Sequence, residues 1–229
     1  MIHQMIFAAP RPGMTADDFA GYWLDVHAVK FASKIPQIRK YKIDTRVPYG
    51  TGDGPPWQGV GEIWLENEED QLASIQTPEF LEGARLDEPN WAAFWLTVVL
   101  DTDAHVLVEP PASPDTDGVK MIRLVKRAEG VGRAEFTQRS LGLYADLVTR
   151  VPGLRGYLQN HTRDALYTMG EAPLDCAHQL WFDDLDALSA ALGSPEFHAA
   201  ERELRSFVEA RYLHEMVVRE HWVIGPEPR

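Results

Sequence analysis

The sequence predicts an α+β protein made of two copies of one β-α-β-β-α-β unit. Two landmarks recur in order along the 229-residue chain. Residues 35–41 (IPQIRKY) match residues 151–157 (VPGLRGY), and residues 77–80 (TPEF) match residues 194–197 (SPEF). The separations are 151 − 35 = 116 and 194 − 77 = 117 residues. Because the two separations agree within one residue, they indicate an internal repeat rather than a chance pairing of single prolines.

Two aromatic pairs fall on the same diagonal: Phe19 with Phe136, and Trp64 with Trp181. Residues 110–118 are rich in Pro, Ser and Asp and almost free of apolar side chains, which is typical of a linker. The chain therefore divides into a first repeat at residues 1–109, a linker at 110–118 and a second repeat at 119–229.

The elements of the first repeat follow from apolar runs and helix-start signals. Thr15 is expected to cap a helix that carries Asp17 and Asp18 in its first turn. A second helix is expected to begin near Asn67, and a short one to follow the TPEF motif. The expected strands are residues 5–8, a strand from Ile38, residues 60–65 and residues 97–106.

The second repeat gives the same order. A second helix is expected to begin near Asp184, and a short one to follow the SPEF motif. The expected strands are residues 120–125, a strand from Leu154, residues 177–182 and residues 215–223. This order is that of a ferredoxin-like unit, whose four-stranded antiparallel sheet has helices on one face and leaves the other face bare. We therefore expect the two fused repeats to pack their sheets as an α+β barrel with an internal pseudo-two-fold axis, in place of a homodimer.

The motif residues resemble one known family. The pattern F-x-x-Y-W-x-x-x-H-A at residues 19–28, followed by the landmark at 35–41, is similar to the EthD pattern, as is VPGLRGYLQNH at 151–161. The resemblance spans both repeats and implies the dimeric α+β barrel fold. Proteins of that fold include cofactor-independent oxygenases, polyketide cyclases, lactone isomerases and haem proteins, so the fold alone does not specify the chemistry.

Composition narrows the possible partners. The formal charge is −13, from 22 basic and 35 acidic residues, which disfavours binding to nucleic acid and to anionic membranes. Cys176 is the single cysteine, and no long apolar segment or signal-like start is present, so a cytoplasmic protein is expected. Seven Trp, seven Tyr and nine Phe suit a pocket for a hydrophobic small molecule.

His27 is the leading candidate for a catalytic residue. A histidine has an ordinary pKa near 6.5, which suits proton transfer, and Trp23 lies one helical turn before it on the same face. Tyr41 offers a hydroxyl to an enolate or phenol, and Asp44 is a candidate to orient His27 or to act as a base. The alternative for His27 is a core histidine, and for Tyr41 a structural tyrosine.

Further residues are candidates for a substrate pocket, although aromatic residues at such spacing are more often core. They are Tyr22, Trp23, Trp64, Glu62, Trp91 and Trp95. No histidine pair has metal-ligand spacing, and the glycines at 50, 52 and 54 lie in a Pro-rich loop instead of a strand-to-helix turn that binds phosphate. Neither a metal nor another cofactor is therefore expected.

The second repeat lacks the Trp and His of the first at residues 138–144, which suggests that only the cleft beside His27 is competent for chemistry. The leading interpretation is a cofactor-independent enzyme that acts on a hydrophobic carbonyl or phenolic compound by His-mediated proton transfer, as a cyclase, dehydratase, isomerase or lyase. The alternatives are a cofactor-independent monooxygenase and a non-catalytic small-molecule-binding protein. Either a monomer or a further homodimer fits the fused arrangement.

Overall fold

The computed structural model describes residues 1–50, 54–111 and 118–229. Most of the expected linker, residues 112–117, thus lies outside the described residues. The chain forms two compact units. The first unit comprises Met1–Val47, Pro56–Thr102 and Arg219–Arg229, and the second comprises Pro48–Pro55 and Asp103–Val218.

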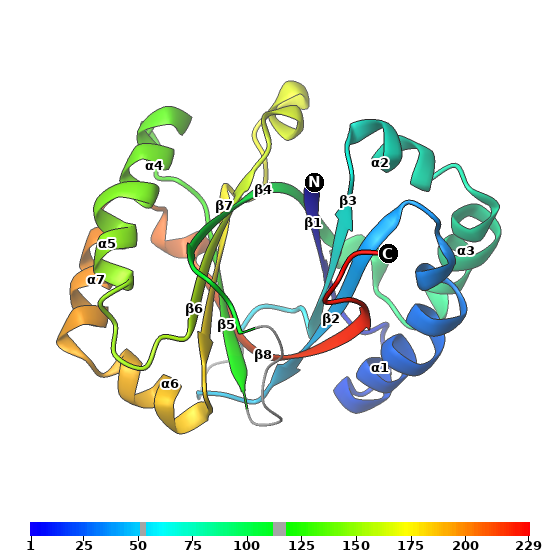
Figure 1. Cartoon of the computed structure of the whole chain (residues 1–229), viewed down its shortest axis with the longest axis horizontal. Helices are drawn as coiled ribbons and strands as arrows, with labels where there is room; N and C mark the ends of the chain where they lie inside the picture. Colours follow the sequence, from blue (N-terminus) through cyan, green and yellow to red (C-terminus); the bar gives the residue numbers. More distant parts are fainter. Residues whose placement is uncertain (51–53, 112–117) are drawn as a thin grey trace. The chain divides into compact units, whose positions relative to one another are not determined.

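The first unit contains a sheet in the order β4-β1-β3-β2-β8. Its strands are β1 (Ile2–Ala8), β2 (Ile38–Val47), β3 (Gly59–Leu65), the start of β4 (Val98–Val108) and the end of β8 (His214–Ile224). β1 pairs antiparallel with β3 and β4, and β2 pairs antiparallel with β3. The helices α1 (Ala16–Tyr22), α2 (Glu68–Ser74) and α3 (Arg85–Asp87) lie on one side of this sheet, as Figure 1 shows.

Short helical turns complete the first unit. Two are π-helical: η1 (Trp23–Ala28), which continues α1, and η3 (Glu79–Ala84), which leads into α3. The others are the 3₁₀ turns η2 (Ala32–Lys34), η4 (Glu88–Asn90) and η5 (Phe94–Leu96). A π-turn adds a residue to a helix and is frequent at functional sites.

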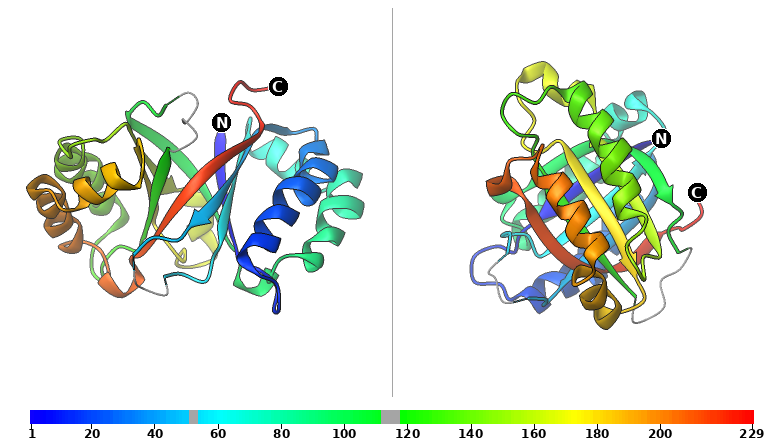
Figure 2. Two further views of the ribbon diagram at one scale, coloured as in Figure 1. Left: turned by 90° about the horizontal axis from the view of Figure 1, so that it is seen from below. Right: turned by 90° about the vertical axis from the view of Figure 1, so that its left-hand side faces the viewer.

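The second unit repeats this plan with the order β8-β5-β7-β6-β4. Its own strands are β5 (Val119–Val125), β6 (Gly156–Thr162) and β7 (Cys176–Phe182). Helix α7 (Pro195–Arg205) lies alongside α4 (Arg133–Arg139) and α5 (Ala145–Val148) over the sheet, as Figure 2 shows. The remaining helical segments are η6 (Ser140–Tyr144), α6 (Leu185–Leu192), η7 (Asp164–Met169) and η8 (Ala210–Tyr212).

The hydrogen-bonded strand order of the described residues is β1-β3-β2-β8-β5-β7-β6-β4 and closes on β1, so the expected α+β barrel topology is confirmed. The two long strands each contribute residues to both units. β4 pairs with β1 through residues before Asp103, and β8 pairs with β5 through residues before Arg219.

The repeated TPEF and SPEF motifs are helix starts. Thr77 Oγ1 accepts a hydrogen bond from the backbone N–H of Phe80 at 3.2 Å, and Ser194 Oγ accepts one from Phe197 at 3.1 Å. Proline follows each cap because its fixed φ suits the first helical position and its missing N–H is not needed there. The expected cap at Thr15 is confirmed, as are the helix starts expected near Asn67 and Asp184. Each of these three side chains accepts a hydrogen bond from the backbone N–H three residues later.

Candidate active site

A cavity of about 130 Å³ lies in the first unit, lined by residues of the sheet and of its helical segments. Its wall is mostly apolar. The two indoles of Trp23 and Trp91 form part of it, together with aliphatic side chains of β1 and β2. The polar groups among its lining residues include the His27 imidazole and the Tyr41 hydroxyl. A mostly apolar pocket with few polar groups is the usual form of a small-molecule site.

The α1 helix and its π-turn position the first pocket residues. Thr15 caps the helix, and the acids that follow it complement the helix dipole. Trp23 and His27 both lie in the π-turn η1, four residues apart, and both are buried. The turn therefore directs an indole and an imidazole to the same side, toward the cavity.

Trp23 lies against a stretch of β3 that has no side chains on that face. A Cβ at Gly59 would stand 2.9 Å from Trp23 Cζ3, and a Cβ at Gly61 would stand 3.0 Å from Trp23 Cζ2. The indole N–H donates to the Tyr41 hydroxyl oxygen at 2.9 Å. Burial raises the pKa of Tyr41, so this hydroxyl keeps its proton at neutral pH.

His27 is held by an acid from a separate helical segment. Its Nδ1 lies 2.9 Å from Oδ2 of Asp87, at the end of α3. The other oxygen, Oδ1, accepts from the Tyr22 hydroxyl at 2.8 Å and from the Asn90 amide at 3.1 Å. With its carboxylate occupied in this way, Asp87 fixes the ring of His27 and leaves Nε2 as the nitrogen available to a ligand.

The charge states of this pair follow from burial and hydrogen bonding. Burial lowers the pKa of His27 below its ordinary value, and the bond to Asp87 opposes this only in part. Burial raises the pKa of Asp87, but hydrogen bonds from Asn90, His27 and Tyr22 outweigh it and hold that pKa below its usual range. At neutral pH the pair is therefore a neutral imidazole beside a carboxylate. The proton stays on Nδ1, and this N–H donates a hydrogen bond to Asp87.

Trp91 packs between the other aromatic rings of the site. Its ring centroid lies 4.7 Å from that of His27, 4.7 Å from that of Trp23 and 5.3 Å from that of Phe19. Together these rings form a continuous aromatic wall beside the imidazole.

The residues expected from the sequence separate into three groups. Four of them line the cavity: His27, Tyr41, Trp23 and Trp91. Tyr22 does not line it, but its hydroxyl donates a hydrogen bond to Asp87, the residue that contacts His27. Trp95 is 71% exposed and does not enter the cavity wall. Asp44, Glu62 and Trp64 alternate with cavity-facing residues along β2 and β3, so they lie on the opposite face of the sheet. The acid that contacts His27 is thus Asp87 and not Asp44.

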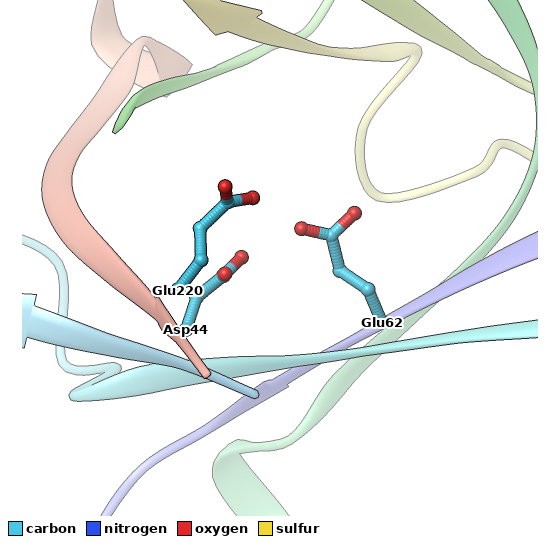
Figure 3. Close-up of side chains that lie close together, drawn as sticks. All are labelled: Asp44, Glu62 and Glu220. Carbon is cyan, nitrogen blue, oxygen red and sulfur yellow. The ribbon is translucent and has the colours of Figure 1, made fainter. Parts of the chain in front are cut away.

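On that opposite face, the carboxylates of Asp44, Glu62 and Glu220 point toward one another, as Figure 3 shows, with ligand-type oxygens within 4.8 Å. The ammonium group of Lys42 pairs with Glu220 and lies 3.5 Å from Glu62 Oε1. His3 Nε2 lies 2.6 Å from Glu62 Oε2, and the His3 ring stacks on Trp64 with centroids 4.3 Å apart. A cation is therefore already present among these acids, and we read the cluster as a buried ion-pair network.

Comparison with known families decides the identity of the fold. The sequence matches the EthD domain in two segments, residues 11–94 and 128–210. The chain belongs to the EthD family. It carries two EthD domains, which confirms the internal repeat, and no curated protein matches the sequence.

Solved structures with the same fold match almost the whole chain. A protein named as a candidate monooxygenase from Fusobacterium nucleatum has a TM-score of 0.65 at 6% identity, covering 100% of this chain and 95% of its own. One so named from Lactobacillus acidophilus has a TM-score of 0.58 at 11% identity, covering 100% and 97%. An anthrone oxidase-like protein has a TM-score of 0.67 at 13% identity, covering 96% and 92%. None of the helices in the described part of the chain has both the length and the apolar composition of a membrane span.

The second EthD domain does not repeat the cavity chemistry. On the diagonal of 117, Tyr144 stands at the position of His27, Arg123 at that of Ile6 and His178 at that of Gly61. Arg123, Tyr144 and His178 are all at most 1% exposed, and Arg123 Nη1 donates to the Tyr144 hydroxyl at 3.2 Å. Large, buried polar side chains thus stand at the positions that hold isoleucine, histidine and glycine in the first domain.

Asp87 is the site residue that the sequence analysis missed. A signal for it exists, because Glu203 lies 203 − 87 = 116 residues later, on the repeat diagonal. Glu203 Oε1 accepts from Arg139 at 2.8 Å, just as Asp87 accepts from Tyr22, and 139 − 22 = 117. An acid opposite the first helix is therefore common to both domains, and the first domain adds the histidine.

Proposed function

We propose that the first EthD domain is a small-molecule enzyme in which His27 acts as a general base. The observation that carries this proposal is the 2.9 Å contact between His27 Nδ1 and Asp87 at the wall of an apolar cavity. A fixed, neutral imidazole with one nitrogen left for a ligand is the arrangement that proton abstraction needs. The substrate class is a hydrophobic phenol, enol or carbonyl compound.

The reaction begins with transfer of a substrate proton to His27 Nε2. Asp87 holds the ring in the tautomer with its proton on Nδ1, and its negative charge stabilises the imidazolium that forms. Return of the proton to a different atom of the substrate gives isomerisation, cyclisation, dehydration or carbon–carbon cleavage. Proton transfer of this kind requires no cofactor.

The cavity limits the size of the buried part of the substrate. Its volume of about 130 Å³ is close to that of an apolar protein cavity that holds a single benzene ring. Ile75 and Phe94 line it but are 48% and 51% exposed, so they mark its mouth. We therefore propose that one ring of the substrate is buried and that the rest contacts these apolar side chains.

Cofactor-independent oxygenation is a second candidate, and the full-length structural matches named above favour it. In that reaction the anion formed by His27 reacts with O₂. A substrate CH₂ group becomes a carbonyl, and the second oxygen atom leaves as water with the two hydrogens. The substrate supplies all the electrons, so O₂ is the only co-reactant.

The test is a screen of phenolic and polyketide-like compounds by native mass spectrometry and thermal shift, followed by turnover assays in an oxygen electrode. It compares the wild type with His27→Gln, and with His198→Gln as the matched control, because His198 is exposed on α7. Loss of the general base lowers turnover by about 100-fold or more while binding persists. Oxygen uptake in step with turnover selects the oxygenase. If the wild type and both variants bind compounds but none converts them, the enzyme proposal is wrong and the chain is a small-molecule-binding protein.

A further inference from the structure

The indole N–H of Trp91 is buried and lacks a hydrogen-bond acceptor. Trp91 is 4% exposed, and its Nε1 has no partner in the part of the chain that the structure describes. Buried indole N–H groups are normally bonded. The two other buried tryptophans of this unit follow that rule, since Trp23 donates to Tyr41 at 2.9 Å and Trp57 donates to the Leu96 carbonyl at 2.8 Å.

The hydroxyl of Tyr41 is a second hydrogen-bond donor in the cavity wall. The oxygen of Tyr41 accepts from Trp23, but its own proton has no acceptor among the described residues. Trp23 joins the two donors, because its N–H bonds Tyr41 while its ring packs on that of Trp91. Both donors are neutral and both belong to residues that line the cavity.

We propose that Trp91 Nε1–H, with Tyr41 O–H as a second donor, forms a subsite for the oxyanion of a phenol or enol substrate. This inference rests on the proposed function and names the group that receives the negative charge. The hydroxyl of a bound phenol would donate its proton to His27 Nε2 and accept from Trp91, whose ring centroid lies 4.7 Å from the imidazole. After proton transfer the same oxygen is a phenolate, and N–H donors fixed in an apolar site stabilise such a charge.

The probe is 4-nitrophenol, whose ionisation is read by its visible absorbance, with nitrobenzene as the ring of similar shape that has no hydroxyl. Affinities for 4-nitrophenolate and nitrobenzene are measured for the wild type and for Trp91→Phe. The phenylalanine keeps an aromatic ring against His27, Phe19 and Trp23 but lacks the N–H. Trp57→Phe is the matched control, because the acceptor of that N–H is a backbone carbonyl.

The expected result is that Trp91→Phe weakens phenolate binding by about tenfold or more while nitrobenzene affinity stays within about twofold. Trp57→Phe should leave the ratio of the two affinities unchanged. Equal losses for both probes, no change in either, or no phenolate binding by the wild type would each overturn the subsite. If Trp91→Phe does not fold, the indole N–H resonance of Trp91 in wild-type protein decides, since 4-nitrophenolate should shift it downfield and leave that of Trp57 in place.

The same experiment separates this inference from the proposed function. In His27→Gln, turnover is lost but the dependence of phenolate affinity on Trp91 remains, because the N–H does not act through the imidazole. If the wild-type protein binds phenolate through Trp91 but converts no substrate, the result supports the oxyanion subsite and contradicts the proposal that His27 is a general base.

Discussion

The ring of Trp23 lies directly on the backbone of Gly61, so that a Cβ at residue 61 would stand 3.0 Å from Trp23 Cζ2. In the second domain His178 occupies that position of the strand and Ser140 stands at 23 + 117 = 140, where the first domain has Trp23. In the first domain a glycine on the strand faces a tryptophan on the helix. In the second domain a histidine stands at the strand position and a serine at the helix position. Both pairs combine one large and one small side chain, as close packing between helix and sheet requires.

Replacing Gly61 by alanine should displace Trp23 and close part of the cavity. We expect Gly61→Ala to lower the free energy of unfolding by about 1–3 kcal/mol, because overpacking forces neighbouring side chains to move. Gly21→Ala is the control, since a Cβ there meets nothing within 4 Å and alanine favours the helix by about 1 kcal/mol. Urea unfolding measures both, and equal stabilities of the two variants would contradict the contact.

Asp87 should act on turnover through His27. Asp87→Asn removes the charge that raises the pKa of His27, so an NMR titration should find that pKa still lower than in the wild type. Turnover should fall by about 100-fold or more, because the amide neither fixes the Nδ1–H tautomer of His27 nor stabilises the imidazolium that forms. Tyr22→Phe, which removes only a neutral donor to Asp87, should cost less than Asp87→Asn. A pKa of His27 that does not respond to Asp87→Asn would count against the pair.

The rate should depend on pH in a defined direction. His27 is a base only when neutral, and burial lowers its pKa below the ordinary 6.5. Turnover should therefore be constant near pH 7 and fall as the pH drops through a value below 6.5. The residual rate of His27→Gln should lack this inflection. An inflection above 6.5 in the wild type would mean that a different group titrates.

The two acids that pair with the buried Arg123 should contribute unequally to the free energy of unfolding. Arg123 pairs with Glu201, which is 19% exposed at the side chain, and with Glu215, which is 43% exposed and 2.7 Å away. Because water screens the exposed partner more, Glu201→Gln should cost about 1–3 kcal/mol of unfolding free energy and Glu215→Gln less than about 1 kcal/mol. Chemical denaturation compares the two variants, and a larger loss for Glu215→Gln would reverse the ranking.

The fold could be predicted from the sequence because it depends on local signals that occur twice. Caps such as Thr15 and Ser194 are set by residues within one turn, and the repeat diagonal tests each assignment against a second copy. The start of β6 differs from the expectation, because the strand begins at Gly156 instead of Leu154. Strand ends depend on pairing partners, which local patterns do not contain.

The site could be predicted only where side chains follow a helix or strand period. The four-residue helical spacing placed Trp23 and His27 together. Asp44 was expected to reach His27, but it stands three residues after Tyr41 in β2 and lies on the other face of the sheet. Asp87 lies sixty residues from His27 and meets it only through tertiary packing, so no local pattern joins them. Trp95 stands in a short 3₁₀ turn, where no periodicity distinguishes a buried side chain from an exposed one.

The sharing of β4 and β8 has a consequence for how the protein is made. The compact unit that holds the cavity includes Arg219–Arg229, which leave the ribosome last among its residues. Until the second EthD domain has been synthesised, the segment up to Thr102 therefore lacks the β8 residues that pair with the edge of β2. The unit that emerges first is completed last, and its open strand edge is exposed to pairing with other chains while the second half is translated.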